Sequence, residues 1–146
     1  MENNLNDKAE ILMETLPVMR RYSNKVIVIK FGGHAMGKKE YVKTFAQDVS
    51  LLQQVGILPI VVHGGGPQIG EMLKKLKIES NFIDGLRVTD AATIDVVEMV
   101  LCGIINKSIV SAISNEGANA VGISGKDGNL ISAKRLSVID KNSDSN

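Results

Sequence analysis

Two stretches of this sequence decide the fold: VIVIKFGG at residues 26–33 and ILPIVVHGGGP at residues 57–67. Each is a run of apolar, mostly β-branched residues that ends in glycines. This pattern is typical of a strand buried on both faces and followed by a tight loop. We predict the strands at Val26–Ile29 and Ile57–Val62. Apolar residues at helical spacing follow each loop, so strand, loop and helix alternate, which predicts a parallel sheet with right-handed crossovers.

The helices around these strands have clear boundary signals. Residues 9–22 predict an N-terminal helix, which Pro17 should kink. Residues 39–55 predict a second helix, with Gly56 in the position that ends it. Pro67 is expected to open a third helix, because its missing N–H costs little at the first helical position.

The second half of the sequence predicts a hairpin, a long helix and two more strands. Asp84-Gly85 stands between apolar residues, which is a hairpin signal. Thr89 or Asp90 should cap a long helix towards Glu116, which Gly103 bends or breaks. Further strands are expected at the positions Val121–Ser124 and Asn129–Leu136. The fold class is therefore α/β: a mostly parallel sheet with helices on both faces, incomplete because another α/β unit is expected after these strands.

Composition excludes several classes of protein. The chain has 146 residues, a net charge of +1, 3% aromatic residues and no tryptophan, which argues against a nucleic-acid partner. One cysteine and two histidines exclude a disulfide framework and make a Cys/His metal site improbable. The apolar runs are shorter than the roughly 20 residues of a membrane span, and the polar N-terminus is not a secretory signal. We expect a cytoplasmic protein with no membrane partner.

The glycine loops do not match three well-known motifs. A dinucleotide-binding G-x-G-x-x-G that starts at Gly64 would need glycine where Ile69 stands. A phosphate-binding P-loop fits Gly32 to Lys38, but Lys39 follows where a hydroxyl is required for Mg²⁺. An esterase would need G-x-S-x-G, and Lys126 occupies its last glycine. Backbone N–H groups at such loops can nevertheless hold anions, so two of them on neighbouring strands favour a binding site over simple turns.

Four stretches together resemble the amino-acid kinase family. They are VIVIKFGG at 26–33, VVHGGGP at 61–67, DGLRVT at 84–89 and GISGKDGNL at 122–130. The resemblance extends roughly from Leu12 to Leu136 and implies an αβα sandwich. Within the family, the match is to members of arginine biosynthesis that use ATP, with its Mg²⁺, to phosphorylate the side-chain carboxylate of N-acetyl-L-glutamate.

The resemblance also implies roles for individual residues. Lys30 would be catalytic, offsetting negative charge on the transferring phosphoryl group. Gly32 and Gly33 would hold the ATP phosphates through backbone N–H groups. Arg87 would bind the substrate α-carboxylate, ideally as a bidentate fork. The second loop would face the substrate with the glycines Gly64, Gly65 and Gly66. No protein metal ligand is expected, and no base is needed because a carboxylate acceptor is ionised at pH 7.

The same resemblance divides the chain at residue 24. Residues 1–24 are an N-terminal extension, in which Ile11 to Tyr22 resembles the kinked helix that assembles arginine-inhibited members into hexamers. This resemblance implies a homo-oligomer (dimer or hexamer) with L-arginine as feedback inhibitor. Residues 25–146 resemble the acetylglutamate-binding part of the kinase domain, truncated before its nucleotide-binding half. We therefore expect no turnover from the chain alone. Two alternatives stay open: a kinase for a related acid, such as an aminoadipate derivative, and a non-catalytic binding or assembly fragment.

Overall fold

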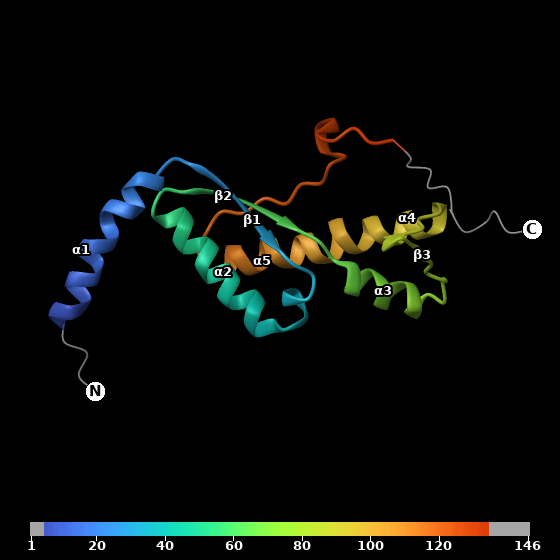
Figure 1. Cartoon of the computed structure of the whole chain (residues 1–146), viewed down its shortest axis with the longest axis horizontal. Helices are drawn as coiled ribbons and strands as arrows, with labels where there is room; N and C mark the ends of the chain where they lie inside the picture. The colour runs from blue at the N-terminus through green and yellow to red at the C-terminus, as the bar shows by residue number, and fades with distance from the viewer. Residues whose placement is uncertain (1–4, 135–146) are drawn as a thin grey trace, which may run out of the picture. The chain divides into compact units, whose positions relative to one another are not determined.

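The computed structural model describes residues 5–134, which form two compact units. Unit 1 contains residues 5–63 and 111–120, and unit 2 contains residues 64–110 and 121–134. The helices and strands are α1 (Leu5–Tyr22), β1 (Val26–Phe31), η1 (Ala35–Gly37), α2 (Lys39–Gln54), β2 (Leu58–His63), α3 (Gly66–Lys75), β3 (Phe82–Ile83), β4 (Leu86–Arg87), α4 (Ala91–Glu98), η2 (Met99–Ile105), α5 (Asn106–Asn115) and η3 (Asp127–Asn129) (Figure 1).

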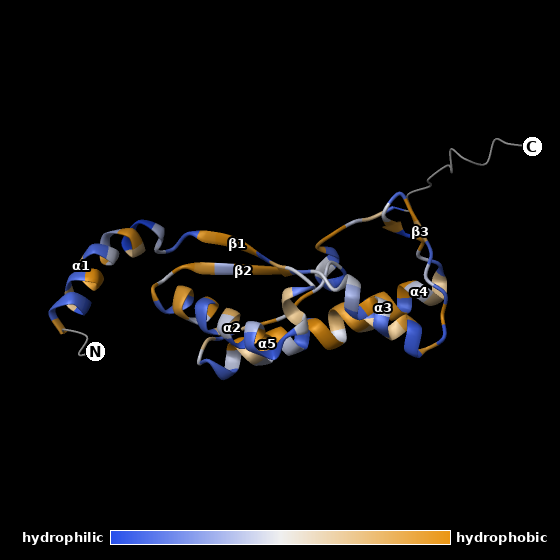
Figure 2. Ribbon diagram, turned by 60° about the horizontal axis from the view of Figure 1, so that its bottom comes forward, coloured by the Kyte–Doolittle hydropathy of each residue, from blue (hydrophilic) through white to orange (hydrophobic). Residues whose placement is uncertain are grey.

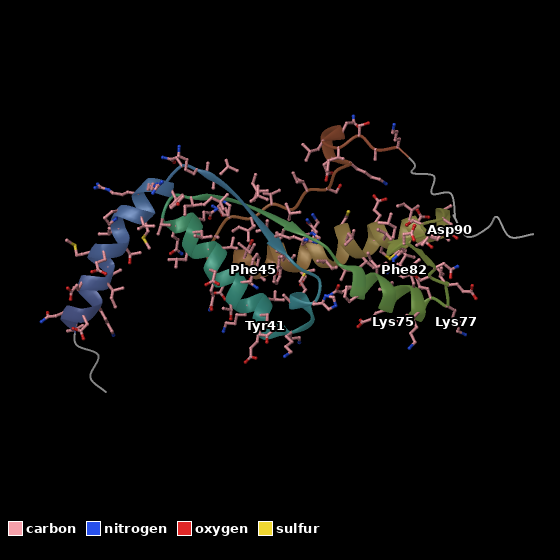
Figure 3. The ribbon with its side chains drawn as sticks, viewed as in Figure 1. Tyr41, Phe45, Lys75, Lys77, Phe82 and Asp90 are labelled. Atoms are coloured by element: carbon pink, nitrogen blue, oxygen red, sulfur yellow. The ribbon has the colours of Figure 1, made fainter. Side chains whose placement is uncertain are left out.

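Unit 1 is built on the predicted parallel strand pair. Strand β1 runs parallel to β2, with Val26 opposite Leu58 and Phe31 opposite His63. The two strands therefore end at the same edge, where the first glycine loop leaves β1. Helix α2 packs against this pair, and the Phe31 ring stacks on Phe45 of α2, labelled in Figure 3, with ring centroids 3.9 Å apart. The α/β class and the parallel pairing are confirmed.

The predicted burial of both strand faces was wrong. One face of the pair packs on α2, whereas the apolar side chains on the other face are at least half exposed. Both strands consist largely of hydrophobic residues, coloured orange in Figure 2. That exposed face carries Val26, Val28, Leu58, Ile60 and Val62. Successive strand residues point to opposite faces of the pair. Within the described residues, only the face toward α2 is covered, so the other face of these apolar strands is exposed to solvent.

Helix boundaries in unit 1 follow their sequence signals. Helix α2 ends at Gln54, one residue earlier than predicted. Gly56 follows with a φ of +86°, in the left-handed region, as expected of the glycine that ends a helix. Two side chains of α2 fix the segment 111–120: Ser50 Oγ donates to the carbonyl of Glu116 at 2.9 Å, and Gln53 exchanges hydrogen bonds with the backbone of Asn119. Helix α1 begins at Leu5, four residues earlier than expected, and contains Pro17.

Unit 2 places α3 against the beginning of the long helix. Helix α3 contacts α4 and η2, and α3 and α4 lie side by side in Figure 1. Leu73 of α3 is fully buried. The Asp90 side chain caps α4 by accepting from the N–H of Thr93 at 2.8 Å, as predicted. Gly103 lies in η2, which is a π-helix. The irregularity expected at Gly103 is therefore a wider helical turn that contains one extra residue, and not a bend or a break.

The inserted residue keeps one face of the long helix buried. The buried positions of α4, η2 and α5 within unit 2 are Thr93, Val96, Val100, Ile105 and Ile109. Their spacing is three or four residues, except across η2, where Val100 and Ile105 lie five apart. The helix at residues 91–115 is long and apolar enough to cross a membrane by length and composition alone, although charged residues interrupt its apolar runs. A helix that packs one stripe against protein passes the same test.

The two strands predicted after the long helix are absent from the described residues. Residues 121–124 are irregular, and so are 130–134; position 136 lies outside the described range. Helix side chains take the backbone carbonyls that a strand would pair: Lys107 Nζ donates to Gly122 at 3.1 Å and Asn106 Nδ2 to Ile123 at 3.4 Å. A β-strand forms when its backbone pairs with the backbone of a neighbouring strand. Here side chains of the long helix bond to the carbonyls instead.

Candidate functional site

The first glycine loop follows Phe31 and leaves its backbone accessible. Lys30 is exposed and lies on the uncovered face of β1, opposite Val62. Gly32 is exposed, and a Cβ built on it would meet nothing within 4 Å. Neither Gly32 nor Gly33 has φ in the left-handed region. Backbone strain and internal packing therefore give no reason for glycine at position 32, whereas close approach of a ligand to the backbone would.

The second glycine loop combines one tightly packed glycine with two open ones. Gly65 is buried, and a Cβ built on it would lie 2.4 Å from Ile105 Cδ1 and 2.8 Å from Leu101 Cδ2. Gly64 and Gly66 have nothing within 4 Å of a built Cβ. None of the three has φ in the left-handed region. Gly65 therefore fixes the loop against η2, whereas a side chain at Gly64 or Gly66 would meet open space.

The hairpin that carries Arg87 forms as the sequence predicts. Asp84 and Gly85 have φ of +49° and +78°, the left-handed pair of a type I′ turn. Strands β3 and β4 pair with Phe82 directly opposite Arg87. Side chains opposite one another in an antiparallel pair lie on the same face, so this register brings the Phe82 ring to Arg87.

Arg87 reaches the second glycine loop. Its Nη2 donates to the carbonyl of Gly66 at 3.4 Å, and its Nη1 donates to Ser80 Oγ. The guanidinium carbon lies 4.6 Å from the centroid of the Phe82 ring. Arg87 is half-buried. Because three neighbours contact its guanidinium, it is not a freely rotating surface side chain. Within unit 2, the structure therefore brings together a glycine loop and a fixed cation.

Sequence reasoning missed two of these neighbours. Phe82 could have been found, because the Asp84-Gly85 turn fixes which residue faces Arg87. Ser80 precedes the hairpin, and no periodic or turn signal links its hydroxyl to Arg87. Lys30, Gly32 and Gly33 belong to unit 1, whereas the other predicted site residues, Gly64, Gly65, Gly66 and Arg87, belong to unit 2.

The charged turn after position 122 is held by local hydrogen bonds. Asp127 accepts from the N–H and the hydroxyl of Ser124, and these bonds hold the pKa of its carboxyl below the ordinary value. Lys126 pairs with Glu98 of α4, and this hydrogen bond raises the pKa of the lysine. Asp127 thus holds the turn internally, and Lys126 ties it to α4. Among residues 5–134, no group of three His, Cys, Asp or Glu side chains is placed to hold a metal ion.

These features define an α/β domain with two glycine loops after parallel strands, and comparison with known proteins gives the class. Residues 25–146 match the amino acid kinase family, so the chain belongs to that family. It is 66% identical to the acetylglutamate kinase of Rhodospirillum rubrum over 129 residues, which cover 88% of this chain and 42% of that protein. It is 58% identical to the acetylglutamate kinase of Rhizorhabdus wittichii over 139 residues, or 95% and 46% of the two chains.

A solved structure shares the fold at lower identity. The N-acetylglutamate synthase of Neisseria gonorrhoeae, complexed with coenzyme A and N-acetyl-glutamate, superposes with a TM-score of 0.70 at 22% identity. The match covers 88% of this chain and 29% of that protein. The chain thus spans less than half of the length of each of these relatives.

Proposed function

We propose that this chain is the N-acetyl-L-glutamate-binding part of an acetylglutamate kinase. The observation that carries the proposal is Arg87, fixed against the backbone of the second glycine loop at Gly66. The high identity to two acetylglutamate kinases supports the choice of substrate. The complete domain would extend the parallel pair into a sheet with helices on both faces, which would cover the exposed face of β1 and β2.

Unit 2 would bind the acid. Arg87 offers a planar guanidinium, which pairs with a carboxylate through two parallel N–H donors. We assign it the α-carboxylate, because the side-chain carboxylate must stay free to accept a phosphoryl group. Gly64 and Gly66 would place backbone N–H groups near the bound acid without steric hindrance. Gly65 would keep this loop in place through its packing on Leu101 and Ile105.

Unit 1 would bind the phosphate groups of ATP, which supplies the phosphoryl group when bound. The open backbone at Gly32 fits an anion, and Gly33 continues the same loop. Lys30, exposed two residues earlier, would offset negative charge that develops during transfer. The acceptor is a carboxylate that is ionised at neutral pH, so no residue of the chain needs to remove a proton. Residues 5–134 contain no group of three His, Cys, Asp or Glu side chains that could hold a metal ion, and we assign no residue to Mg²⁺.

The proposal includes a cytoplasmic homo-oligomer. Helix α1 has no buried residue and exposes apolar side chains such as Leu12 and Leu16, which are 60% and 48% exposed. A helix with this surface suits a second copy of the chain, in a dimer or hexamer. L-Arginine as a feedback inhibitor belongs to the same proposal and would act on the whole enzyme.

Calorimetric titration of N-acetyl-L-glutamate into the chain tests the proposal. We expect binding that falls at least about tenfold in Arg87→Ala, because a charge-assisted bond contributes about 1.5–3 kcal/mol. Arg87→Lys is the matched control: it keeps the charge but loses the fork, so binding should stay well below wild type. Equal affinity in all three proteins would contradict the assignment of Arg87. Preferential binding of N-acetyl-aminoadipate would favour a related kinase.

A further inference from the structure

Arg87 lies in a seat that includes two residues, Phe82 and Ser80, that the proposed chemistry does not otherwise use. The seat has a side wall, the Phe82 ring, whose centroid is 4.6 Å from the guanidinium carbon. It has an anchor, Ser80 Oγ, which accepts from Nη1. It has a floor on α3, where Gly66 accepts from Nη2 and a Cβ built on Gly70 would lie 3.9 Å from the same nitrogen.

The part of α3 beside Arg87 carries no side chain, because two glycines lie there. Gly66 and Gly70 are four residues apart in α3, so they lie on one face of the helix. Neither has a side chain, and the Arg87 guanidinium lies beside this bare face. The hairpin register then fixes the wall, because Phe82 stands directly opposite Arg87 across β3 and β4.

The seat leaves the arginine able to bind an anion. A guanidinium carries five N–H donors, and the contacts with Ser80 and Gly66 engage one donor on each terminal nitrogen. The remaining donors can receive a carboxylate. A long arginine side chain loses rotational freedom when it binds, and neighbours that hold it beforehand reduce that loss. The wall also favours the cation, because a ring face attracts a guanidinium.

We propose that Ser80 and Phe82 are positioning residues for Arg87, which hold its guanidinium at the second glycine loop ready for the α-carboxylate of the acid. This inference rests on the proposed function, since it assigns the carboxylate to Arg87. Neither Ser80 nor Phe82 needs to touch the acid. Both act through the orientation of Arg87, and their removal should therefore leave Arg87 in the protein but poorly placed.

The orientation of Arg87 can be measured without any ligand. In ¹⁵N-labelled chain, the Arg87 Nε–H resonance is assigned by its disappearance in Arg87→Lys. A proton above an aromatic ring resonates upfield of a free arginine. We expect this shift in the wild type, its loss in Phe82→Leu and its retention in Phe82→Tyr. The amide spectrum reports whether each variant is folded. A wild-type resonance at the free-arginine position, or one that Phe82→Leu does not move, overturns the seat.

Titration with N-acetyl-L-glutamate then tests the consequence for binding. We expect Phe82→Leu to weaken binding about two- to fivefold, the usual range for an exposed cation–π contact, and Phe82→Tyr to restore it. Ser80→Ala should weaken binding to a similar extent, and Ser80→Thr, which keeps the hydroxyl, should restore it. Wild-type affinity in both Ser80→Ala and Phe82→Leu would show that the seat does not position Arg87 for the acid.

The two readouts separate the inference from the proposed function. If the wild-type chain shows the upfield Arg87 resonance but no binding of N-acetyl-L-glutamate, the seat exists and the assigned acid is wrong, which overturns the positioning role for that acid. If the acid binds and the Arg87 resonance is that of a free arginine, the proposed function stands and the seat is rejected. An upfield resonance with binding that follows the variants supports both.

Discussion

Gly65 has less room than its neighbours in the second glycine loop. A Cβ there would lie 2.4 Å from Ile105 Cδ1 and 2.8 Å from Leu101 Cδ2, and Ile105 is itself buried. Extra volume in a packed site costs about 1–3 kcal/mol. We therefore expect Gly65→Ala to lower the free energy of unfolding of the chain by about that amount. Urea denaturation followed by circular dichroism measures the change.

Gly66→Ala is the matched control for this substitution. It adds the same methyl group one residue later, where nothing lies within 4 Å, so we expect no loss of stability. The comparison separates packing from the general effect of replacing glycine by alanine. If Gly65→Ala were as stable as Gly66→Ala, the loop would not be fixed by its contact with η2, and the explanation of Gly65 would be wrong.

Local patterns could predict part of the candidate site at the residue scale. The Asp84-Gly85 turn predicted the hairpin, and its register could also have predicted the pairing of Phe82 with Arg87. The contact of Arg87 with Ser80 and with the Gly66 carbonyl depends on how α3 and the hairpin pack, and no short-range pattern encodes it. The roles of Lys30, Gly32 and Gly33 come from the family resemblance and stay predictions.

The start of α4 depends on one carboxylate. Asp90 accepts from Thr93 N–H, and hydrogen bonds with the side chain and the backbone of Thr93 hold the pKa of Asp90 below its ordinary value of 3.8. A carboxyl whose pKa is lowered in the folded protein stabilises the fold above its unfolded pKa, and the contribution is lost as the pH falls through the folded pKa. We expect Asp90→Ala to be less stable than wild type at pH 7, and the difference to shrink below pH 3.8.

Thermal unfolding of the two proteins from pH 7 down to pH 3 measures this dependence. Asp90→Asn provides the control, because asparagine is also a good N-cap but does not titrate over this range. Its difference from Asp90→Ala should therefore stay nearly constant with pH. A gap between wild type and Asp90→Ala that does not change with pH would show that the charge of Asp90 contributes nothing to the cap.

The elements that sequence predicted well are those with local signals. Helix α2 with Gly56, the opening of α3 at Pro67 and the Asp90 cap all depend on residues within one turn. The segment 121–124 was predicted as a strand from its apolar residues, but a strand also needs a neighbour to pair with. Here Asn106 and Lys107 take its carbonyls. The π-helix η2 was equally hidden, because only Gly103 hinted at an irregularity.

At the scale of the whole molecule, the exposed apolar side chains of α1 favour contact with another protein surface. Leu12 and Leu16 lie four residues apart and therefore on one face of the helix, and both are exposed. We expect the chain to self-associate through this face. The double substitution Leu12→Glu with Leu16→Glu should weaken self-association at least about tenfold, because burying a leucine contributes about 1.5–3 kcal/mol.

Sedimentation equilibrium over a range of concentrations measures this association. Lys8→Glu is the matched control, because it lowers the net charge as much as the double substitution does and changes an exposed polar position of the same helix. Association that Lys8→Glu preserves and the double substitution removes would place the interface on the apolar face of α1. If both variants associated like the wild type, the contact would have to lie elsewhere. The exposed apolar face of β1 and β2 would then be the next surface to substitute, because its valines and leucine are also at least half exposed.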